Sequence, residues 1–144
     1  EHGMSGVCML GAAKQKSWLS DQKFAKKYGF ETVDTAAGGY ELLTLSFDGT
    51  KPRFAPNVKQ EIGEKELTVY YDYQCPYIFQ RIEKLRSYCA ENGICANFVL
   101  INSLKKAKEL PCVFNNWAVF YGGKFVTVNQ IDAAAVKKLI SKDL

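Results

Sequence analysis

The chain has 144 residues, of which 47% are hydrophobic and 13% aromatic, so it can bury a core and does not belong to the disordered classes. Its 19 basic and 15 acidic residues give a net charge of +4, and this excess is spread along the chain. A nucleic-acid partner is not expected, because such proteins carry a concentrated basic stripe. No apolar run approaches the ~18 residues of a membrane span, so no membrane partner is expected either.

Cysteine and histidine usage limits the possible chemistry. The five cysteines are odd in number, match no zinc spacing and follow no secretory signal, which favours a reducing cytoplasmic setting. Cys8, Cys89 and Cys95 lie in apolar patterns and are predicted to be core residues. His2 is the one histidine, so neither a metal site nor a Ser-His-Asp triad is expected. Because the chain begins Glu1-His2-Gly3, we expect it to be a fragment of a longer protein.

The first segment, residues 1–48, reads as strand, helix, strand, strand. A short apolar run over 7–10 predicts a buried strand. Ser20 can cap a helix that ends at Gly29, in which Phe24, Ala25 and Tyr28 share one face. Strands are predicted over 31–34 and 40–47.

Two stretches of this segment, KFAKKYGFETVD and YELLTLSF, resemble the C-terminal half of the GNAT acetyltransferase fold. The resemblance implies that the strand over 7–10 is the family's fifth strand, which flanks the acetyl-CoA cleft. In an intact parent the cleft would then be flanked by Val7, Cys8, Met9 and Leu10. The resemblance also implies a small-molecule or peptide amine as the acceptor.

The sequence departs from that family in two ways. The glycine-rich loop that holds the cofactor pyrophosphate is absent, so this chain alone is expected to bind no acetyl-CoA and to be inactive. Many members also place a general-acid tyrosine four residues before the glycine that corresponds to Gly29. That position is Ala25 here, and Tyr28 is therefore interpreted as a core aromatic.

The first strand has no upstream partner in this sequence. An unpaired strand edge invites pairing, so residues 1–50 are expected to pair with another copy or to lie on the later sheet. This predicts a possible homo-oligomer.

A linker is predicted over 49–63, where glycines and prolines interrupt the chain. A β-α-β unit follows over 67–101. It has strands at 67–71 and 96–100 and a helix from Pro76 to the stop signal Asn92-Gly93.

The remaining residues predict a hairpin and a helix. Residues 102–109 form a short helix or loop. Strands over 117–121 and 124–128 flank Gly122-Gly123, a hairpin signal. Asp132 then caps a last helix whose Val136, Leu139 and Ile140 face inward. The order from residue 64 to 144 is that of a thioredoxin-like domain.

Cys75 is the candidate reactive residue of this domain. It precedes a helix, whose unpaired N–H groups and dipole favour the thiolate over the thiol. Thioredoxin-like proteins carry the first cysteine of C-x-x-C at this position, but here the motif is C-P-Y-I and Ile78 replaces the second thiol. A structural role for Cys75 at the end of a strand remains equally open.

Two functional interpretations of the domain follow from the resemblance. In the first, Pro111 is the cis-proline of the fold and Cys112 comes near Cys75, giving a redox pair. In the second, the domain recognises a substrate or partner without chemistry, through a groove around Cys75, Tyr77, Pro111 and Trp117.

The combination of the two segments is more specific than either one. It resembles the YoaP-like C-terminal region of certain microbial GNAT-family acetyltransferases. The expected fold is therefore α/β (α+β), with a truncated GNAT half followed by a thioredoxin-like domain. The expected function is that of an N-acetyltransferase tail, and thiol/disulfide chemistry is the alternative.

Overall fold

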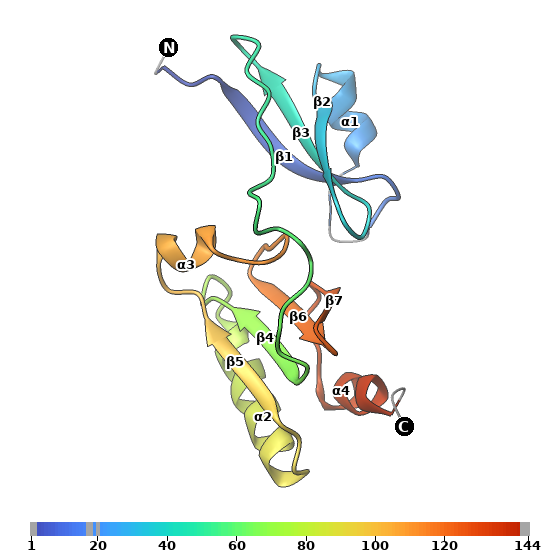
Figure 1. Cartoon of the computed structure of the whole chain (residues 1–144), viewed down its shortest axis with the longest axis vertical. Helices are drawn as coiled ribbons and strands as arrows, with labels where there is room; N and C mark the ends of the chain where they lie inside the picture. The colour runs from blue at the N-terminus through green and yellow to red at the C-terminus, as the bar shows by residue number, and fades with distance from the viewer. Residues whose placement is uncertain (1–2, 17–18, 20, 142–144) are drawn as a thin grey trace. The chain divides into compact units, whose positions relative to one another are not determined.

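The computed structural model describes residues 3–16, 19 and 21–141 (Figure 1). These residues form a mixed α/β structure with two sheets and four helices. The chain divides into two compact units, Glu1–Lys59 and Gln60–Leu144. The segment predicted as a linker, 49–63, is thus shared between the two units.

The first unit is a three-stranded antiparallel sheet with one short helix. Its sheet order is β1-β3-β2, so the last strand in sequence is central. The elements are β1 (Gly6–Ala12), α1 (Gln22–Lys27), β2 (Glu31–Ala36) and β3 (Tyr40–Ser46). The predicted order of elements is confirmed.

Helix α1 begins at a different cap from the predicted one. The side chain of Asp21 accepts a hydrogen bond from the Lys23 backbone N–H at 2.9 Å. The predicted cap, Ser20, lies outside the described residues. Of the α1 residues only Ala25 is buried.

The interpretation of Tyr28 as a core aromatic is wrong. Phe24 and Tyr28 are 66% and 60% exposed, and their rings contact each other at a centroid distance of 4.9 Å. The helix has only six residues and buries one of them, so Phe24 on the helix and Tyr28 at its C-cap contact each other on the surface instead.

One edge of β1 carries unpaired backbone groups. Phe47 N–H donates to Ser5 C=O, and Ala13 N–H donates to Gly39 C=O. The odd-numbered residues of β1 therefore form the backbone hydrogen bonds to β3. The even-numbered residues, from Gly6 to Ala12, direct their N–H and C=O groups away from β3. Within the described residues no strand pairs with this edge.

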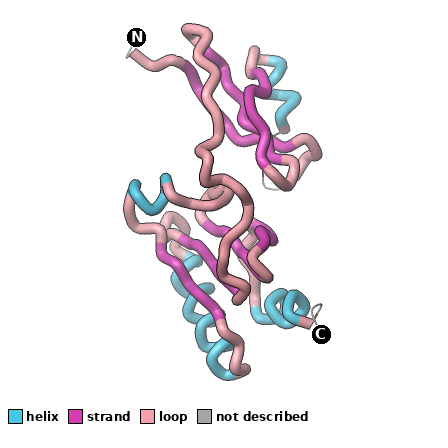
Figure 2. The backbone as a smooth tube through the Cα atoms, viewed as in Figure 1, coloured by secondary structure: helices cyan, strands magenta, loops and turns pink. Residues whose placement is uncertain are grey.

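The second unit contains a mixed four-stranded sheet. Its order is β5-β4-β6-β7, with β5 parallel to β4 and both hairpin strands antiparallel to their neighbours. The elements are β4 (Leu67–Tyr71), α2 (Tyr77–Glu91), β5 (Ala96–Leu100), α3 (Leu104–Lys108), β6 (Trp117–Tyr121), β7 (Lys124–Thr127) and α4 (Ala133–Ile140). Figure 2 shows that the chain between β3 and β4 is loop throughout.

Local signals placed most of these elements correctly. Helix α2 follows Pro76 and ends at Asn92, and Gly93 has the left-handed φ of 64° that its C′ position requires. Gly122 and Gly123 also have positive φ, which forms the predicted hairpin. Asp132 caps α4 by accepting a hydrogen bond from Ala135 N–H at 2.9 Å.

The two faces of this sheet pack against different clusters. The face toward α2 and α4 carries the larger core, with Leu67, Val69, Tyr71, Trp117 and Val119 from the strands. The opposite face carries a smaller cluster of Cys112, Ala118 and Phe120, joined by the half-buried Ile62, Tyr70, Phe114 and Phe125. Alternation along β4 and β6 separates the two sets of side chains.

The residues at the start of the second unit are part of its structure. Gln60 N–H donates to Pro111 C=O at 2.7 Å, and Phe125 N–H donates to Gln60 C=O at 3.0 Å. Ile62 N–H donates to Gly123 C=O at 2.9 Å. Residues 60–62 therefore hold the β6–β7 hairpin rather than serving as a free connection.

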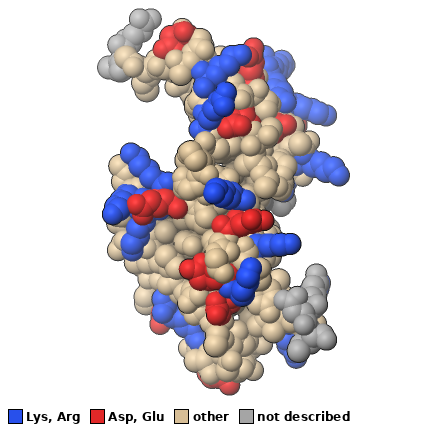
Figure 3. Space-filling view, in the orientation of Figure 1, with Lys and Arg blue, Asp and Glu red and all other residues tan. Residues whose placement is uncertain are grey.

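Charge of both signs is spread over the face drawn in Figure 3, where lysine and arginine alternate with aspartate and glutamate. Among the described helices, none has both the length and the apolar character needed to cross a membrane.

Candidate functional site

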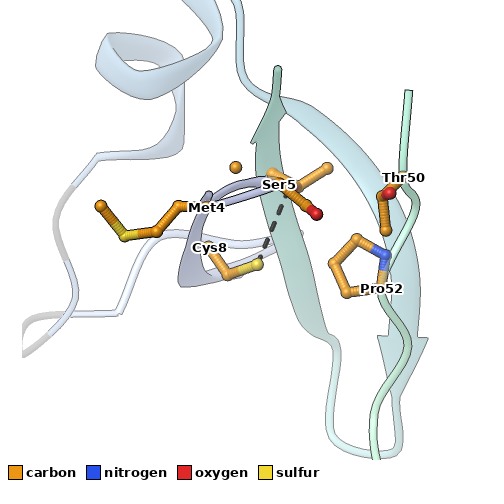
Figure 4. A pocket seen from close by; sticks show the side chains of 7 residues that line it. Met4, Ser5, Cys8, Thr50 and Pro52 are labelled. Carbon is orange, nitrogen blue, oxygen red and sulfur yellow. Dashed lines mark hydrogen bonds between the residues drawn. The ribbon is translucent and has the colours of Figure 1, made fainter. Parts of the chain in front are cut away.

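A small pocket lies beside β1 in the first unit (Figure 4). Its walls come from β1 and the residues before it, from β3, and from the loop after β3. The lining residues are Met4, Ser5, Gly6, Cys8, Thr44, Thr50 and Pro52. A Cβ built at Gly6 would lie 2.5 Å from the Leu45 carbonyl oxygen, so glycine is required for β1 to approach β3 this closely.

A hydrogen-bond chain fixes the thiol of Cys8 in this pocket. The Thr44 hydroxyl donates to the Val7 carbonyl oxygen at 3.2 Å, and the Cys8 Sγ lies 3.7 Å from Thr44 Oγ1. Because the single hydroxyl proton of Thr44 goes to Val7, the Cys8 thiol is the donor to Thr44.

A carboxylate lies close to two of the pocket residues. Asp48 Oδ1 accepts the Thr50 backbone N–H at 2.9 Å. Hydrogen bonds from the Thr50 side chain and backbone and from the Ser5 side chain lower the pKa of Asp48 to about 2. Asp48 is therefore a carboxylate at neutral pH.

The structure brings only one of the four predicted cleft residues into the pocket. Cys8 lines it, whereas Val7 and Met9 lie on the other face of β1 because side chains alternate along a strand. Leu10 shares the face of Cys8 but does not line the pocket.

Sequence reasoning missed the other pocket residues. Thr50 and Pro52 come from the loop after β3, and Thr44 comes from a strand 36 residues further along the chain than Cys8. These residues come together only because the loop after β3 folds back over the sheet. No local sequence pattern predicts the course of that loop.

In the second unit, Cys75 lies in the turn between β4 and α2. Its carbonyl oxygen accepts the Ile78 N–H at 3.0 Å, and its half-buried side chain packs against the larger core. Ile78 is fully buried, while Tyr77 is 73% exposed. The predicted position of Cys75 just before a helix is confirmed.

The proposed partner of Cys75 is elsewhere. No described peptide bond is cis, so the Leu110–Pro111 bond is trans and the expectation of a cis-proline at Pro111 is wrong. Both cysteines are free thiols. Cys112 belongs to the smaller cluster and Cys75 contacts the larger one, on the opposite face of the sheet. The fold therefore does not bring the two sulfurs together as a redox pair.

Burial also limits two of the predicted site residues. Cys112 is buried, and desolvation raises the pKa of its thiol to about 12. Trp117 is fully buried opposite Tyr71, so its ring offers no surface to a partner. Of the four residues expected to form a groove, Tyr77 is exposed, Cys75 and Pro111 are half-buried, and Trp117 is a core residue.

Two of the three cysteines predicted to be core residues are exposed. Cys89 is buried on α2, as expected, and burial raises the pKa of its thiol. Cys8 and Cys95 are exposed, because Cys8 lies on the face of β1 that borders the pocket and Cys95 lies in the loop before β5. In the part of the chain that the structure describes, no group of three or more potential metal ligands occurs.

Comparison with known proteins gives two similarities. Residues 96–139, from β5 into α4, match a family described as YoaP-like. Over 142 residues the chain is 31% identical to the "Uncharacterized N-acetyltransferase YoaP" of Bacillus subtilis (strain 168). That alignment covers 96% of this chain and 57% of the relative, so the chain spans little more than half of the relative's length. No solved structure matches the chain.

Proposed function

We propose that this chain is the C-terminal part of a GNAT-family, acetyl-CoA-dependent N-acetyltransferase. The observation that carries the proposal is the 31% identity over 142 residues to a protein named as an N-acetyltransferase. The YoaP-like match supports the same acetyltransferase-related family. The sheet order β1-β3-β2, with α1 between β1 and β2, agrees with the resemblance of the first unit to the C-terminal half of the GNAT fold.

The first unit would contribute one wall of the acyl-transfer cleft. Attack of an amine on a thioester requires the amine to be held against the acyl carbon. The outward edge of β1 and the adjoining pocket give this unit a surface against which such a substrate can lie. We propose a small-molecule or peptide amine as the acceptor.

The residues of the first unit do not fit the cofactor pyrophosphate. A diphosphate needs free backbone N–H groups at the start of a helix. The helix of this unit, α1, has six residues, and the Asp21 carboxylate caps its first turn with a negative charge. We therefore propose that acetyl-CoA binding needs residues outside this chain.

Calorimetric titration with acetyl-CoA tests this proposal. This chain should give no saturable heat. A polypeptide extended upstream to the length of the Bacillus subtilis relative should bind acetyl-CoA and release coenzyme A when an amine is added. Saturable binding by this chain alone would contradict the proposal that the residues holding the cofactor phosphates lie outside it. Failure of the extended polypeptide both to bind and to transfer would contradict the acetyltransferase assignment.

We propose that the second unit is a thioredoxin-like module that recognises a substrate or partner. Three features of the sheet support a thioredoxin-like module: β4 is central, β5 pairs with it in parallel, and β6 and β7 form an antiparallel hairpin. The exposed Tyr77, beside Cys75 at the start of α2, supplies a contact surface. The five free cysteines of the structure agree with a reducing, cytoplasmic location.

A thiol role for Cys75 is the second candidate. It is favoured by the half-buried sulfur just before a 15-residue helix. Cys75→Ser discriminates between the two readings, with Cys95→Ser as the matched exposed-cysteine control. Recognition predicts that partner binding survives Cys75→Ser. The thiol role predicts that the Cys75 thiolate attacks a disulfide substrate, forms a mixed disulfide and releases the substrate's other thiol, and that this exchange is almost abolished only in Cys75→Ser.

A further inference from the structure

The second unit exposes a set of large apolar side chains in the segments that follow the carboxyl ends of β4 and β5. Tyr73, Tyr77 and Phe79 are 50%, 73% and 57% exposed, and Leu104 is 71% exposed. We name these four residues the aromatic edge. Large apolar side chains that are exposed near one another mark interaction surfaces in soluble proteins.

Ring contacts join two residues of the aromatic edge, Tyr73 and Phe79, to each other and to the end of β4. The Tyr73 ring lies 5.5 Å from that of Tyr71 and 6.1 Å from that of Phe79, measured between centroids. A hydrogen bond between the two tyrosine side chains raises the pKa of Tyr73, and this bond fixes the ring. Tyr77 lies in the first turn of α2, between these rings in sequence.

The same edge carries lysines from α3. The parallel strands β4 and β5 end side by side, and Ile101 N–H donates to Tyr71 C=O at 2.8 Å. Lys106 Nζ in turn donates to Leu100 C=O at 3.0 Å, which ties α3 to the end of β5. Figure 1 shows α3 at the end where the arrows of β4 and β5 point.

The two segments that carry the aromatic edge are basic. Residues 72–86 and 101–109 contain six basic and three acidic residues, an excess of three in a chain whose total is +4. Asp72 accepts the Gln74 N–H, and Glu83 pairs with Arg86 at 3.8 Å, so one acid and one base of this set are engaged with each other. Figure 3 shows basic side chains gathered over α3.

We infer that this edge binds an acidic polypeptide segment that carries apolar side chains. Exposed aromatic residues provide the anchors of protein interfaces, and a charged rim selects partners of opposite sign. Nucleic acid would require a longer basic stripe, and a peripheral membrane anchor would require a longer amphipathic helix than the five residues of α3. This inference rests on the proposed recognition role and adds the chemistry of the partner.

Fluorescence anisotropy with two labelled model peptides tests the inference. One peptide alternates glutamate with phenylalanine, and the other replaces every glutamate by lysine. The acidic peptide should bind and should weaken as NaCl is raised, whereas the basic peptide should not bind.

Matched variants locate the binding surface. Tyr77→Ala should weaken binding of the acidic peptide roughly tenfold, and Lys105→Glu roughly fivefold. The controls are Tyr28→Ala, which removes a tyrosine of similar exposure from the first unit, and Lys137→Glu, which reverses an exposed lysine of α4; neither should change binding.

Three outcomes overturn the inference in different ways. If both peptides bind alike and Tyr77→Ala still weakens them, the recognition role stands and the acidic partner is wrong. If neither peptide binds, the recognition role fails as well. If phosphatidylglycerol vesicles bind through Lys105 while the acidic peptide does not, the surface is a membrane contact.

Discussion

At the scale of single residues, burial decides which cysteine can react. Cys112 is buried with Ala118 and Phe120 in the smaller cluster. Desolvation there raises the pKa of its thiol from 9.0 to about 12. Cys8 and Cys95 are exposed. An alkylating reagent at neutral pH should therefore reach the exposed thiols first and Cys112 only after unfolding.

Cys112 should also make stability depend on alkaline pH. The unfolded chain releases this thiol proton near pH 9, whereas the folded chain retains it until about pH 12. Between these values the unfolded state binds fewer protons, so the free energy of unfolding falls as pH rises, by at most about 1.4 kcal/mol per pH unit. Urea titrations from pH 8 upward should show a shallower fall for Cys112→Ala than for the unmodified chain.

The control for this measurement is Cys95→Ala, which removes an exposed cysteine and should keep the full slope. Burial also raises the pKa of Tyr70, with a smaller contribution from Cys112, so the difference between variants reports Cys112 together with its effect on Tyr70. Equal slopes for Cys112→Ala and the unmodified chain would contradict the assignment.

Trp117 should behave as a core residue and not as a binding residue. It is fully buried, and its Nε1 has no hydrogen-bond partner among the described residues. Trp117→Ala should lower the free energy of unfolding by about 3–5 kcal/mol. Trp117→Phe should lower it by only about 1–2 kcal/mol, because no hydrogen bond is lost.

Chemical denaturation measures both Trp117 variants, with Tyr77→Ala as the exposed control that should change stability by less than about 0.5 kcal/mol. If Tyr77→Ala lowered the free energy of unfolding as much as Trp117→Ala, the assignment of Trp117 as buried and Tyr77 as exposed would be contradicted.

At the scale of the element, the free edge of β1 is the feature with the clearest consequence. We predict that residues 1–50 associate with another copy through this edge. Cys8→Pro removes an N–H that points away from β3, so it should leave the unit folded and abolish association. Light scattering over a concentration series measures the mass.

Met9→Pro is the matched control, because the Met9 N–H points toward β3 and its loss should destabilise the sheet itself. Circular dichroism separates the two variants. An unmodified chain that stays monomeric at every concentration would rule out pairing between copies.

At the scale of the whole molecule, the two units should be separable. Both hydrophobic clusters, with the larger core under α2 and α4, belong entirely to residues 60–144. Arg53 and Lys59 are exposed in the loop between β3 and β4, so trypsin should cut there first. The product beginning at Gln60 should unfold cooperatively.

A shorter product, residues 66–144, is the control. It lacks the backbone hydrogen bonds of Gln60 to Pro111 and Phe125 and that of Ile62 to Gly123, so it should unfold at a lower urea concentration. If the two products are equally stable, residues 60–65 do not support the hairpin.

The sequence by itself determined the local elements of this protein. The apolar stripe Ile78, Ile82, Leu85 and Cys89 gave α2, and all four residues are buried on it. Gly93 marked the end of α2, Gly122-Gly123 marked the hairpin, and Asp132 marked the start of α4. These features follow from backbone geometry and from contacts within a few residues, which a sequence shows directly.

Only the tertiary structure decided which side chains face solvent, a pocket or the opposite side of the sheet. Cys8 and Tyr28 occur in apolar patterns but are exposed, because no segment among the described residues covers them. Cys75 and Cys112 pack against clusters on opposite faces of one sheet. The sequence suggested that they meet, because Cys75 lies in the turn before a helix and Cys112 follows Pro111, the expected cis-proline. Burial depends on which distant segment covers a face, and that pairing is set by the packing of the whole chain.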